Sequence, residues 1–411
     1  MKFKTNLHTL GSGMRVAVTK TPNYYTAKFR LSVMVGAEDE TAPNGVAHLI
    51  EHTMFKGTDK LSQEEISAKF NSLSADIDAS TSSEFTNYKV EFPKRNLKPV
   101  LELVSHILHD SQFDETLMNK EKQVIVEEIS MHEDNPEQLA FDKLVKEMYK
   151  DNGIGNEIAG TRENLLKTTK PEIYKFYLEH YNPKNFLVSV IGDFDEEEVV
   201  NLVDEYFNKP FLNRTTHQKT KNWSKPSKMK PMSLRVNKQI NQSNILMGFR
   251  TLPFADMDRL SVGLINFILG GSMNSRLFIK VRNDLSLCYS IFSFDMNYSK
   301  NGFVGISLAT SPSHEKQAID AVNAEIEKIH EFGVTDEEFE IAKNLTLDKY
   351  LMYQDVPHVG LTYLAYTGLL LDENDIIEKI KIITKEEALE KFKKYIKPDK
   401  EFCVVVSPSN S

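Results

Sequence analysis

The chain has 411 residues, and its 50 Lys and Arg against 59 Asp and Glu give a formal net charge of −9. This length predicts two or three domains, each large enough to bury a core. With 40% hydrophobic and 27% charged residues, the composition is that of a globular protein, which excludes wholesale disorder, a collagen-like chain and a disulfide scaffold. The acidic balance argues against a nucleic-acid protein that holds phosphates with a general positive field.

The N-terminus lacks the apolar core of a signal peptide, and no stretch approaches 18 consecutive apolar residues. Cys288 and Cys403 are the two cysteines, and each lies in an apolar, strand-like run without the spacing of a redox motif or a metal site. We therefore expect a cytoplasmic protein that does not bind membranes and that works in a reducing compartment.

The first half of the chain mixes strand and helix patterns. Apolar residues recur at every second position in 29–35 and again in 88–92, which predicts strands with one buried face. Between them, Ser62 followed by Glu65 predicts a capping box that begins a helix reaching about Ser74.

The rest of the first half continues this pattern. Residues 113–136 predict a long helix that ends at Pro136, residues 186–191 predict an apolar strand, and Asp195 is expected to begin a further helix.

A basic segment at 209–238 separates the two halves. It contains nine Lys or Arg and no Asp or Glu, with three prolines interspersed. We interpret it as a solvated linker. The alternative, an arm that binds nucleic acid or anionic membranes, would need interleaved aromatic residues or an amphipathic period, and Trp223 alone supplies neither.

The two halves repeat each other. Residues 334–357 reproduce the long-helix pattern of 113–136 at an offset of 221, and each copy ends at a proline, Pro136 or Pro357. Strands separated by helix pairs, without regular βαβ alternation, favour an α+β fold. The prediction is two homologous domains of about 200 residues, each an antiparallel-rich sheet covered by helices. Their boundaries are 1–208 for the first domain, 209–238 for the linker and 239–411 for the second.

The pattern that carries chemistry is His48-Leu49-Ile50-Glu51-His52. Residues four apart on a helix lie one above the other, so both imidazoles can converge on one metal ion. Glu51 lies beside them, where a general base could activate water without binding the metal. The alternative is a pair of capping or core histidines on an amphipathic helix.

A catalytic zinc needs a third protein ligand. Glu121 and Glu128 are seven residues apart on the predicted long helix and share a face, whereas Glu127 points away. We assign Glu128 as the ligand and Glu121 as the neighbour that orients a ligand. An acidic, solvated helix face explains this spacing equally well.

The run from Gly45 to Thr58, with Glu121 and Glu128 beginning 69 residues after His52, resembles the pitrilysin family of zinc peptidases. It is most similar to short bacterial members that resemble the mitochondrial processing peptidase β subunit. The resemblance implies one zinc per chain, held by the two histidines and Glu128. It also implies Glu51 as the base and a supporting role for Glu121.

The resemblance further implies residues that contact substrate. A strand that pairs with extended peptide falls on Asp78, Ala79, Ser80, Thr81 and Ser82, although the family usually has Asn at the position of Asp78. Arg282 and Tyr289 match a pair that reaches the zinc site and steadies the substrate carbonyl. Without the family, a buried Tyr and a surface Arg would be the preferred interpretation.

At the offset of 221 the second half has no zinc ligands, because the positions of the motif and of Glu128 fall on Leu269, Ser272, Met273 and Lys349. The family pairs such halves as a clamshell around a chamber. We therefore predict a zinc endopeptidase that cleaves unfolded, extended peptides and works as a homodimer. The alternatives are a catalytically silent peptide-binding or scaffold subunit and a metal hydrolase that acts on another bond.

Overall fold

The computed structural model describes residues 3–41, 45–214, 231–353, 355 and 373–409. These residues form two compact units. The first contains the described residues up to 130 and residues 152–214, and the second contains 131–151, 231–353 and 373–409. Residues 215–230 of the predicted basic linker and Pro357 lie outside the described residues, and the predicted domain boundaries stay predictions.

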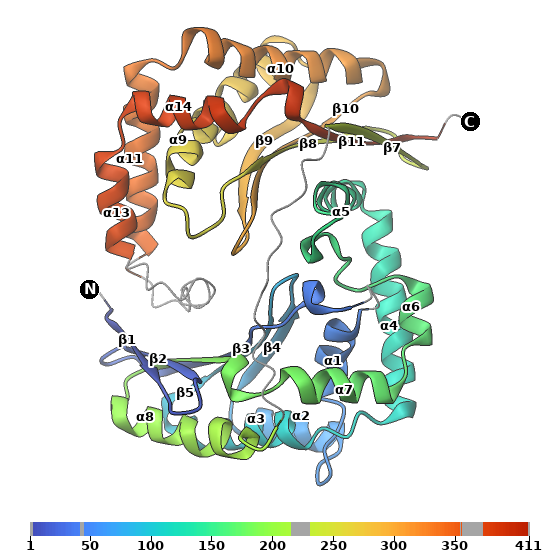
Figure 1. Cartoon of the computed structure of the whole chain (residues 1–411), viewed down its shortest axis with the longest axis vertical. Helices are drawn as coiled ribbons and strands as arrows, with labels where there is room; N and C mark the ends of the chain where they lie inside the picture. The colour runs from blue at the N-terminus through green and yellow to red at the C-terminus, as the bar shows by residue number, and fades with distance from the viewer. Residues whose placement is uncertain (1–2, 42–44, 215–230, 354, 356–372, 410–411) are drawn as a thin grey trace. The chain divides into compact units, whose positions relative to one another are not determined.

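A six-stranded sheet forms the centre of the first unit (Figure 1), in the order β1-β2-β6-β3-β5-β4. Neighbouring strands are antiparallel except β2 and β6, which are parallel. The strands are β1 (Thr5–Thr9), β2 (Arg15–Lys20), β3 (Thr26–Val33), β4 (Asp76–Thr81), β5 (Thr86–Pro93) and β6 (Phe186–Gly192).

Helices cover this sheet and close its core. The helices are α1 (Val46–Met54), α2 (Gln63–Ser72), α3 (Leu97–Asp110), α4 (Glu115–Asp134), α6 (Arg162–Lys167), α7 (Lys170–His180) and α8 (Glu196–Val203). The alternate apolar residues of β3 and β5 enter the core, as the period-two pattern predicted. Beneath α1, the hydroxyls of Tyr88 and Tyr181 are 2.7 Å apart and fully buried, and burial raises the pKa of both tyrosines.

The second unit contains a five-stranded sheet in the order β7-β11-β8-β10-β9. Its strands are β7 (Met232–Lys238), β8 (Ser243–Thr251), β9 (Cys288–Asn297), β10 (Gly302–Thr310) and β11 (Phe402–Pro408). Its helices are α5 (Pro136–Met148), α9 (Asp258–Gly270), α10 (Glu315–Phe332), α11 (Asp336–Tyr353), α13 (Glu373–Ile382) and α14 (Lys385–Tyr395).

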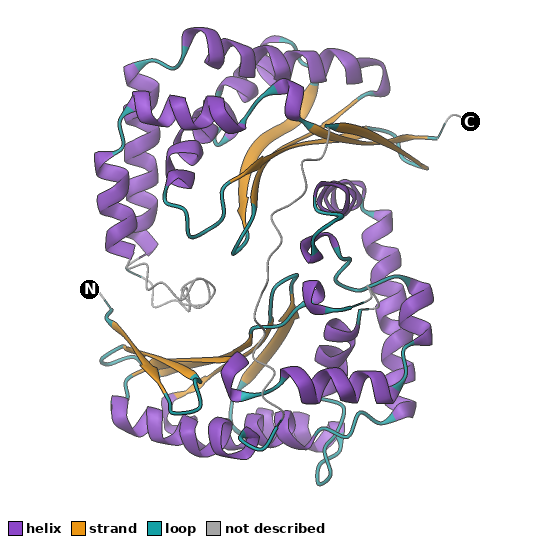
Figure 2. Ribbon diagram, viewed as in Figure 1, coloured by secondary structure: helices purple, strands orange, loops and turns teal. Residues whose placement is uncertain are grey.

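Helix α5 comes from the first half of the sequence but packs in the second unit, against β8 and β11 (Figure 2). A Cβ atom on Gly248 of β8 would come within 2.8 Å of Leu144 and Met148, so glycine allows α5 to approach the sheet closely. Because α9 and α14 cover the other face, β8 is buried on both sides.

The predicted duplication appears in the sheets. The order β2-β6-β3-β5-β4 of the first unit recurs as β7-β11-β8-β10-β9, with one parallel pair, β2·β6 or β11·β7, at the corresponding place. The predicted α+β fold with antiparallel-rich sheets is therefore confirmed, whereas the clamshell arrangement stays a prediction.

Of two local predictions, the capping box is confirmed and the role of Pro136 differs from the one expected. The capping box of Ser62 and Glu65 is present, and its helix ends at Ser72. Pro136 does more than end α4, because it is the first residue of α5, whose N-cap Asn135 accepts hydrogen bonds from the first turn of α5.

Among the described residues, no helix has the length and apolar character that crossing a membrane would require.

Candidate metal centre

Helix α1 carries the His48–His52 motif, and its N-terminus is fixed by an acidic side chain. The N-cap residue, Gly45, has φ 73° and no side chain to cap the helix. Glu40 supplies the missing cap, because its carboxylate accepts hydrogen bonds from the Gly45 and Ala47 N–H groups at 2.9 and 2.8 Å. A Cβ atom on Gly45 would lie 2.3 Å from the Ala159 carbonyl oxygen, so the position requires glycine.

Both imidazoles of the motif face one carboxylate of α4. Oε2 of Glu128 lies 3.7 Å from His48 Nε2 and 3.6 Å from His52 Nε2. The donor atoms of these three side chains lie within 4.8 Å of one another. Neighbouring ligands of a tetrahedral zinc are about 3.4 Å apart, so the spacing and the His-His-Glu chemistry fit a catalytic zinc site.

Glu121 lies seven residues, about two helical turns, before Glu128. It contacts Nδ1 of His52, the imidazole nitrogen that does not face Glu128. Its Oε2 is 3.3 Å from His52 Nδ1, and its Oε1 is 2.9 Å from Lys56 Nζ. A carboxylate only accepts hydrogen bonds, so His52 Nδ1 carries the proton and leaves the Nε2 lone pair facing Glu128. Glu127, by contrast, is exposed. As predicted, Glu121 and Glu128 share the face of α4 that lies toward the histidines, and Glu127 lies on another face.

Glu51 lies beside the three donors and receives a hydrogen bond from Thr81, whose Oγ1 is 2.8 Å from Glu51 Oε2. Burial raises the pKa of Glu51, although the Thr81 hydroxyl and the charge of His52 act in the opposite direction. Burial acts to lower the pKa of His52, but the Glu128 and Glu121 carboxylates, which accept hydrogen bonds from the imidazolium, and the charge of Glu51 raise it overall.

The residues expected to pair with peptide lie at an edge of the first sheet. Asp78, Ala79, Ser80 and Thr81 belong to β4, and Ser82 follows it. β4 pairs with β5 on one side and has no strand partner on the other among the described residues. Asp78, at the position where the family usually has Asn, forms an exposed ion pair with Lys89 at 3.1 Å. Peptide pairing at this edge stays a prediction.

Arg282 and Tyr289 lie together in the second unit. The Arg282 guanidinium lies over the Tyr289 ring, 5.2 Å from its centroid, and over Phe278 at 4.5 Å. Tyr289 is 82% exposed, so the alternative of a buried tyrosine is wrong. Their role in catalysis stays a prediction.

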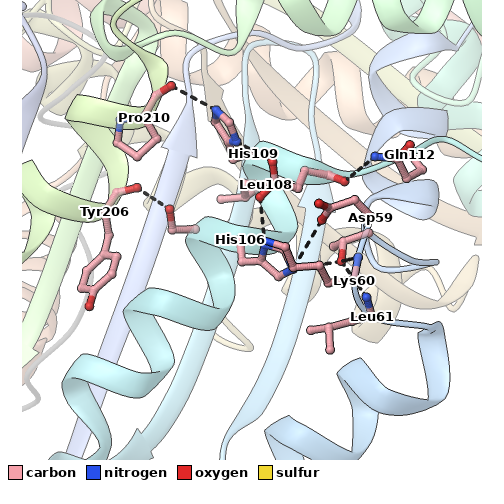
Figure 3. A network of polar contacts seen from close by, with 12 residues as sticks. Asp59, Lys60, Leu61, His106, Leu108, His109, Gln112, Tyr206 and Pro210 are labelled. Atoms are coloured by element: carbon pink, nitrogen blue, oxygen red, sulfur yellow. Dashed lines mark hydrogen bonds and ion pairs between the residues drawn. The ribbon is translucent and has the colours of Figure 1, made fainter.

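A second cluster of donors joins the loop after α1 to the end of α3 (Figure 3). His106 Nδ1 lies 2.8 Å from Asp110, and its Nε2 lies 3.0 Å from Thr58 Oγ1 and 3.8 Å from Asp59. Burial raises the pKa of Asp110, but hydrogen bonds from His109 and His106 outweigh it and hold that pKa below its usual value. Both nitrogens of His106 have oxygen partners, which supports a structural network.

Within the described ranges, both groups of potential metal donors lie in the first unit. In the second unit, the positions that correspond to the motif include Leu269, which is buried in α9, and Met273, which is 76% exposed. Lys349 stands on α11 where α4 has Glu128.

Family models match both parts of the chain. Residues 15–162 match "Insulinase (Peptidase family M16)" and residues 167–346 match "Peptidase M16 inactive domain". The chain belongs to peptidase family M16. The short bacterial type of this family, expected from the sequence, is confirmed by curated relatives of nearly the same length.

Two of these M16 relatives are called uncharacterized zinc proteases. One, from Rickettsia felis, is 29% identical over 95% of this chain and 94% of its own. Another, from Bacillus subtilis, is 26% identical over 91% of this chain and 90% of its own. The family and these names support a peptidase that uses zinc.

Solved structures show the same M16 fold. A protease from Helicobacter pylori covers 99% of this chain and 100% of its own, with a TM-score of 0.91 at 20% identity. A structure from Pseudomonas fluorescens, described as a peptidase M16 inactive domain, covers 99% of both chains, with a TM-score of 0.90 at 18% identity. At these identities the likeness concerns the fold.

Three contacts at the centre escaped sequence reasoning: the cap from Glu40, the hydrogen bond from Thr81 and the ion pair from Lys56. Thr81 was singled out only as a substrate residue. Lys56 lies in the loop after the end of α1, so helical spacing does not predict its contact with Glu121.

Proposed function

We propose that this protein is a zinc-dependent endopeptidase that cleaves unfolded peptides bound in extended conformation, with one zinc per chain. The observation that carries the proposal is the convergence of His48, His52 and Glu128, with Glu51 beside them and outside the group. Three ligands leave a coordination position open, which is the pattern of a catalytic rather than a structural zinc.

Each residue then has a distinct role. His48, His52 and Glu128 would hold the zinc, which when bound polarises a carbonyl and lowers the pKa of water. Glu51 takes a proton from the attacking water and passes it to the leaving amine, and the Thr81 hydroxyl holds the Glu51 carboxylate in place.

The substrate would add to the free side of β4, where main-chain hydrogen bonds bind an extended peptide whatever its side chains. Arg282 and Tyr289 would stabilise the charge that develops on the scissile carbonyl. An exposed tyrosine hydroxyl beside a guanidinium is chemically suited to that task.

The test compares the wild-type protein with Glu51→Gln on a defined mixture of unfolded peptides, with cleavage followed by mass spectrometry and zinc measured by elemental analysis. We expect about one zinc per chain in both, and loss of hydrolysis by 100-fold or more in Glu51→Gln, the scale of general-base catalysis (~10²–10⁴-fold). Normal turnover by Glu51→Gln would refute the mechanism. A zinc-loaded wild type that binds the peptides and cleaves none would instead establish the silent-subunit alternative.

A further inference from the structure

We propose that Lys56 is a positioning residue of the metal centre, which acts by holding the Glu121 carboxylate against His52. The inference rests on the proposed function, since it assumes that His52 binds zinc. The contacts form a chain in which Lys56 Nζ lies 2.9 Å from one oxygen of Glu121, and the other oxygen lies 3.3 Å from His52 Nδ1.

The burial of these groups makes the cation important. The Glu121 side chain is 13% exposed and that of Lys56 is 23% exposed, so both charges are largely removed from water. Glu51 and Glu128 add two further carboxylates nearby. A carboxylate in such surroundings needs a partner, and Lys56 provides a charge-assisted hydrogen bond.

The backbone beside Lys56 is fixed independently of the metal centre. Helix α1 ends at Met54, and the following loop forms isolated bridges from Gly57 to Ser62 and from Thr58 to Ser111. The Thr58 hydroxyl also contacts His106 in the network of Figure 3. The lysine therefore extends from an anchored loop, which makes it a fixed point for the Glu121 carboxylate.

The consequence concerns His52. While Glu121 accepts a hydrogen bond from Nδ1–H, the Nε2 lone pair stays directed toward Glu128 and the proposed metal position. Without Lys56, the Glu121 carboxylate would keep only its longer contact with His52 Nδ1 and would be drawn toward solvent. The variant removes one positive charge and leaves the Glu121 carboxylate free to move, so the expected effect is greater freedom of the His52 ring.

The experiment measures the rate at which a colorimetric chelator removes zinc from the purified, zinc-loaded protein. Lys56→Met keeps the length of the side chain without its charge, Lys56→Arg keeps the charge, and Lys60→Met is the control because Lys60 is an exposed lysine in the same loop. We expect about tenfold faster zinc loss for Lys56→Met, the lower end of the 10–100-fold effect of outer-shell partners. Lys56→Arg should lose zinc at a rate within about threefold of the wild-type rate, and Lys60→Met should lose zinc at the wild-type rate.

A double-mutant cycle with Glu121→Gln separates this role from general destabilisation. If Lys56 acts through Glu121, then Lys56→Met should change zinc release little once Glu121→Gln is present. The visible spectrum of the cobalt-substituted protein should shift in the same way in both single variants. Lys56→Gln replaces the methionine variant if the latter does not fold.

Equal zinc release from Lys56→Met and wild type, slower release, or fully additive effects in the cycle would overturn the role of Lys56. A wild-type protein that binds no zinc would instead contradict the proposed function, so the two failures are distinguishable.

Discussion

The Thr81 hydroxyl donates a 2.8 Å hydrogen bond to Glu51, and so connects the edge strand β4 to the side chain beside the three potential metal donors. The same strand carries the residues expected to pair with peptide. A peptide added at that edge would therefore lie against the backbone of a residue whose side chain contacts the proposed base. Peptide binding and proton transfer would share one structural element.

The first prediction follows from this hydrogen bond. Thr81→Val keeps the shape of the side chain and the strand backbone but removes the donor, so kcat should fall about tenfold, because a hydrogen bond to a charged group contributes about 1.5–3 kcal/mol. Thr81→Ser retains a hydroxyl and should stay near wild type. Steady-state kinetics with a fluorogenic peptide, at verified zinc content, would measure both. An unchanged kcat in Thr81→Val would show that Glu51 does not depend on this contact.

The second prediction concerns the two neighbouring glutamates of α4. Glu128→Gln removes the negative charge that faces both imidazoles, so zinc affinity should fall by more than about 100-fold, beyond the loss expected for outer-shell partners. Glu127→Gln changes an exposed side chain one position away and should keep full zinc content. Elemental analysis after dialysis against a weak chelator would compare them, and equal zinc in the two variants would exclude Glu128 as the third ligand.

Local patterns explain which parts could be predicted. The spacing of His48 and His52 predicted their common face because it depends only on helix geometry, and the same argument separated Glu128 from Glu127. The alternation in β3 and β5 predicted their buried faces for a similar reason.

The unpredicted features depend on tertiary contacts. Lys56 reaches Glu121 across 65 positions of sequence, and Thr81 reaches Glu51 across 30. Neither pairing leaves a periodic trace. Helix α5 is amphipathic in sequence, but nothing in its local pattern indicates that it packs on the sheet of the second unit.

The third prediction tests the hydroxyl of Tyr289. Tyr289→Phe keeps the ring that the Arg282 guanidinium covers and removes only the exposed hydroxyl, so folding and zinc content should be unaffected. If the hydroxyl stabilises the scissile carbonyl in the transition state, kcat should fall about 100-fold, as for the loss of one oxyanion donor. Tyr24→Phe, at another exposed tyrosine, is the control. A wild-type kcat in Tyr289→Phe would exclude a catalytic role for the Tyr289 hydroxyl.

The last prediction is that the active protein is a homodimer that cleaves unfolded peptides and spares folded proteins. The resemblance to the family implies a chamber built from four such units. One chain supplies two of them, and it carries both the candidate metal centre and the Arg282–Tyr289 pair. A second copy can therefore complete the chamber without a different subunit. Light scattering should give about twice the chain mass of 47.0 kDa.

Selectivity can be tested with a small stable domain and a destabilised variant of it that is unfolded under the assay conditions. An extended peptide offers its main chain to the edge of β4, but a folded domain must first unfold, at a cost of about 5–15 kcal/mol. The unfolded variant should therefore be cleaved at least about 1,000-fold faster than its folded parent, because 1.4 kcal/mol corresponds to a factor of ten. Comparable cleavage of both, or full activity in a monomer, would contradict an enclosed dimeric chamber.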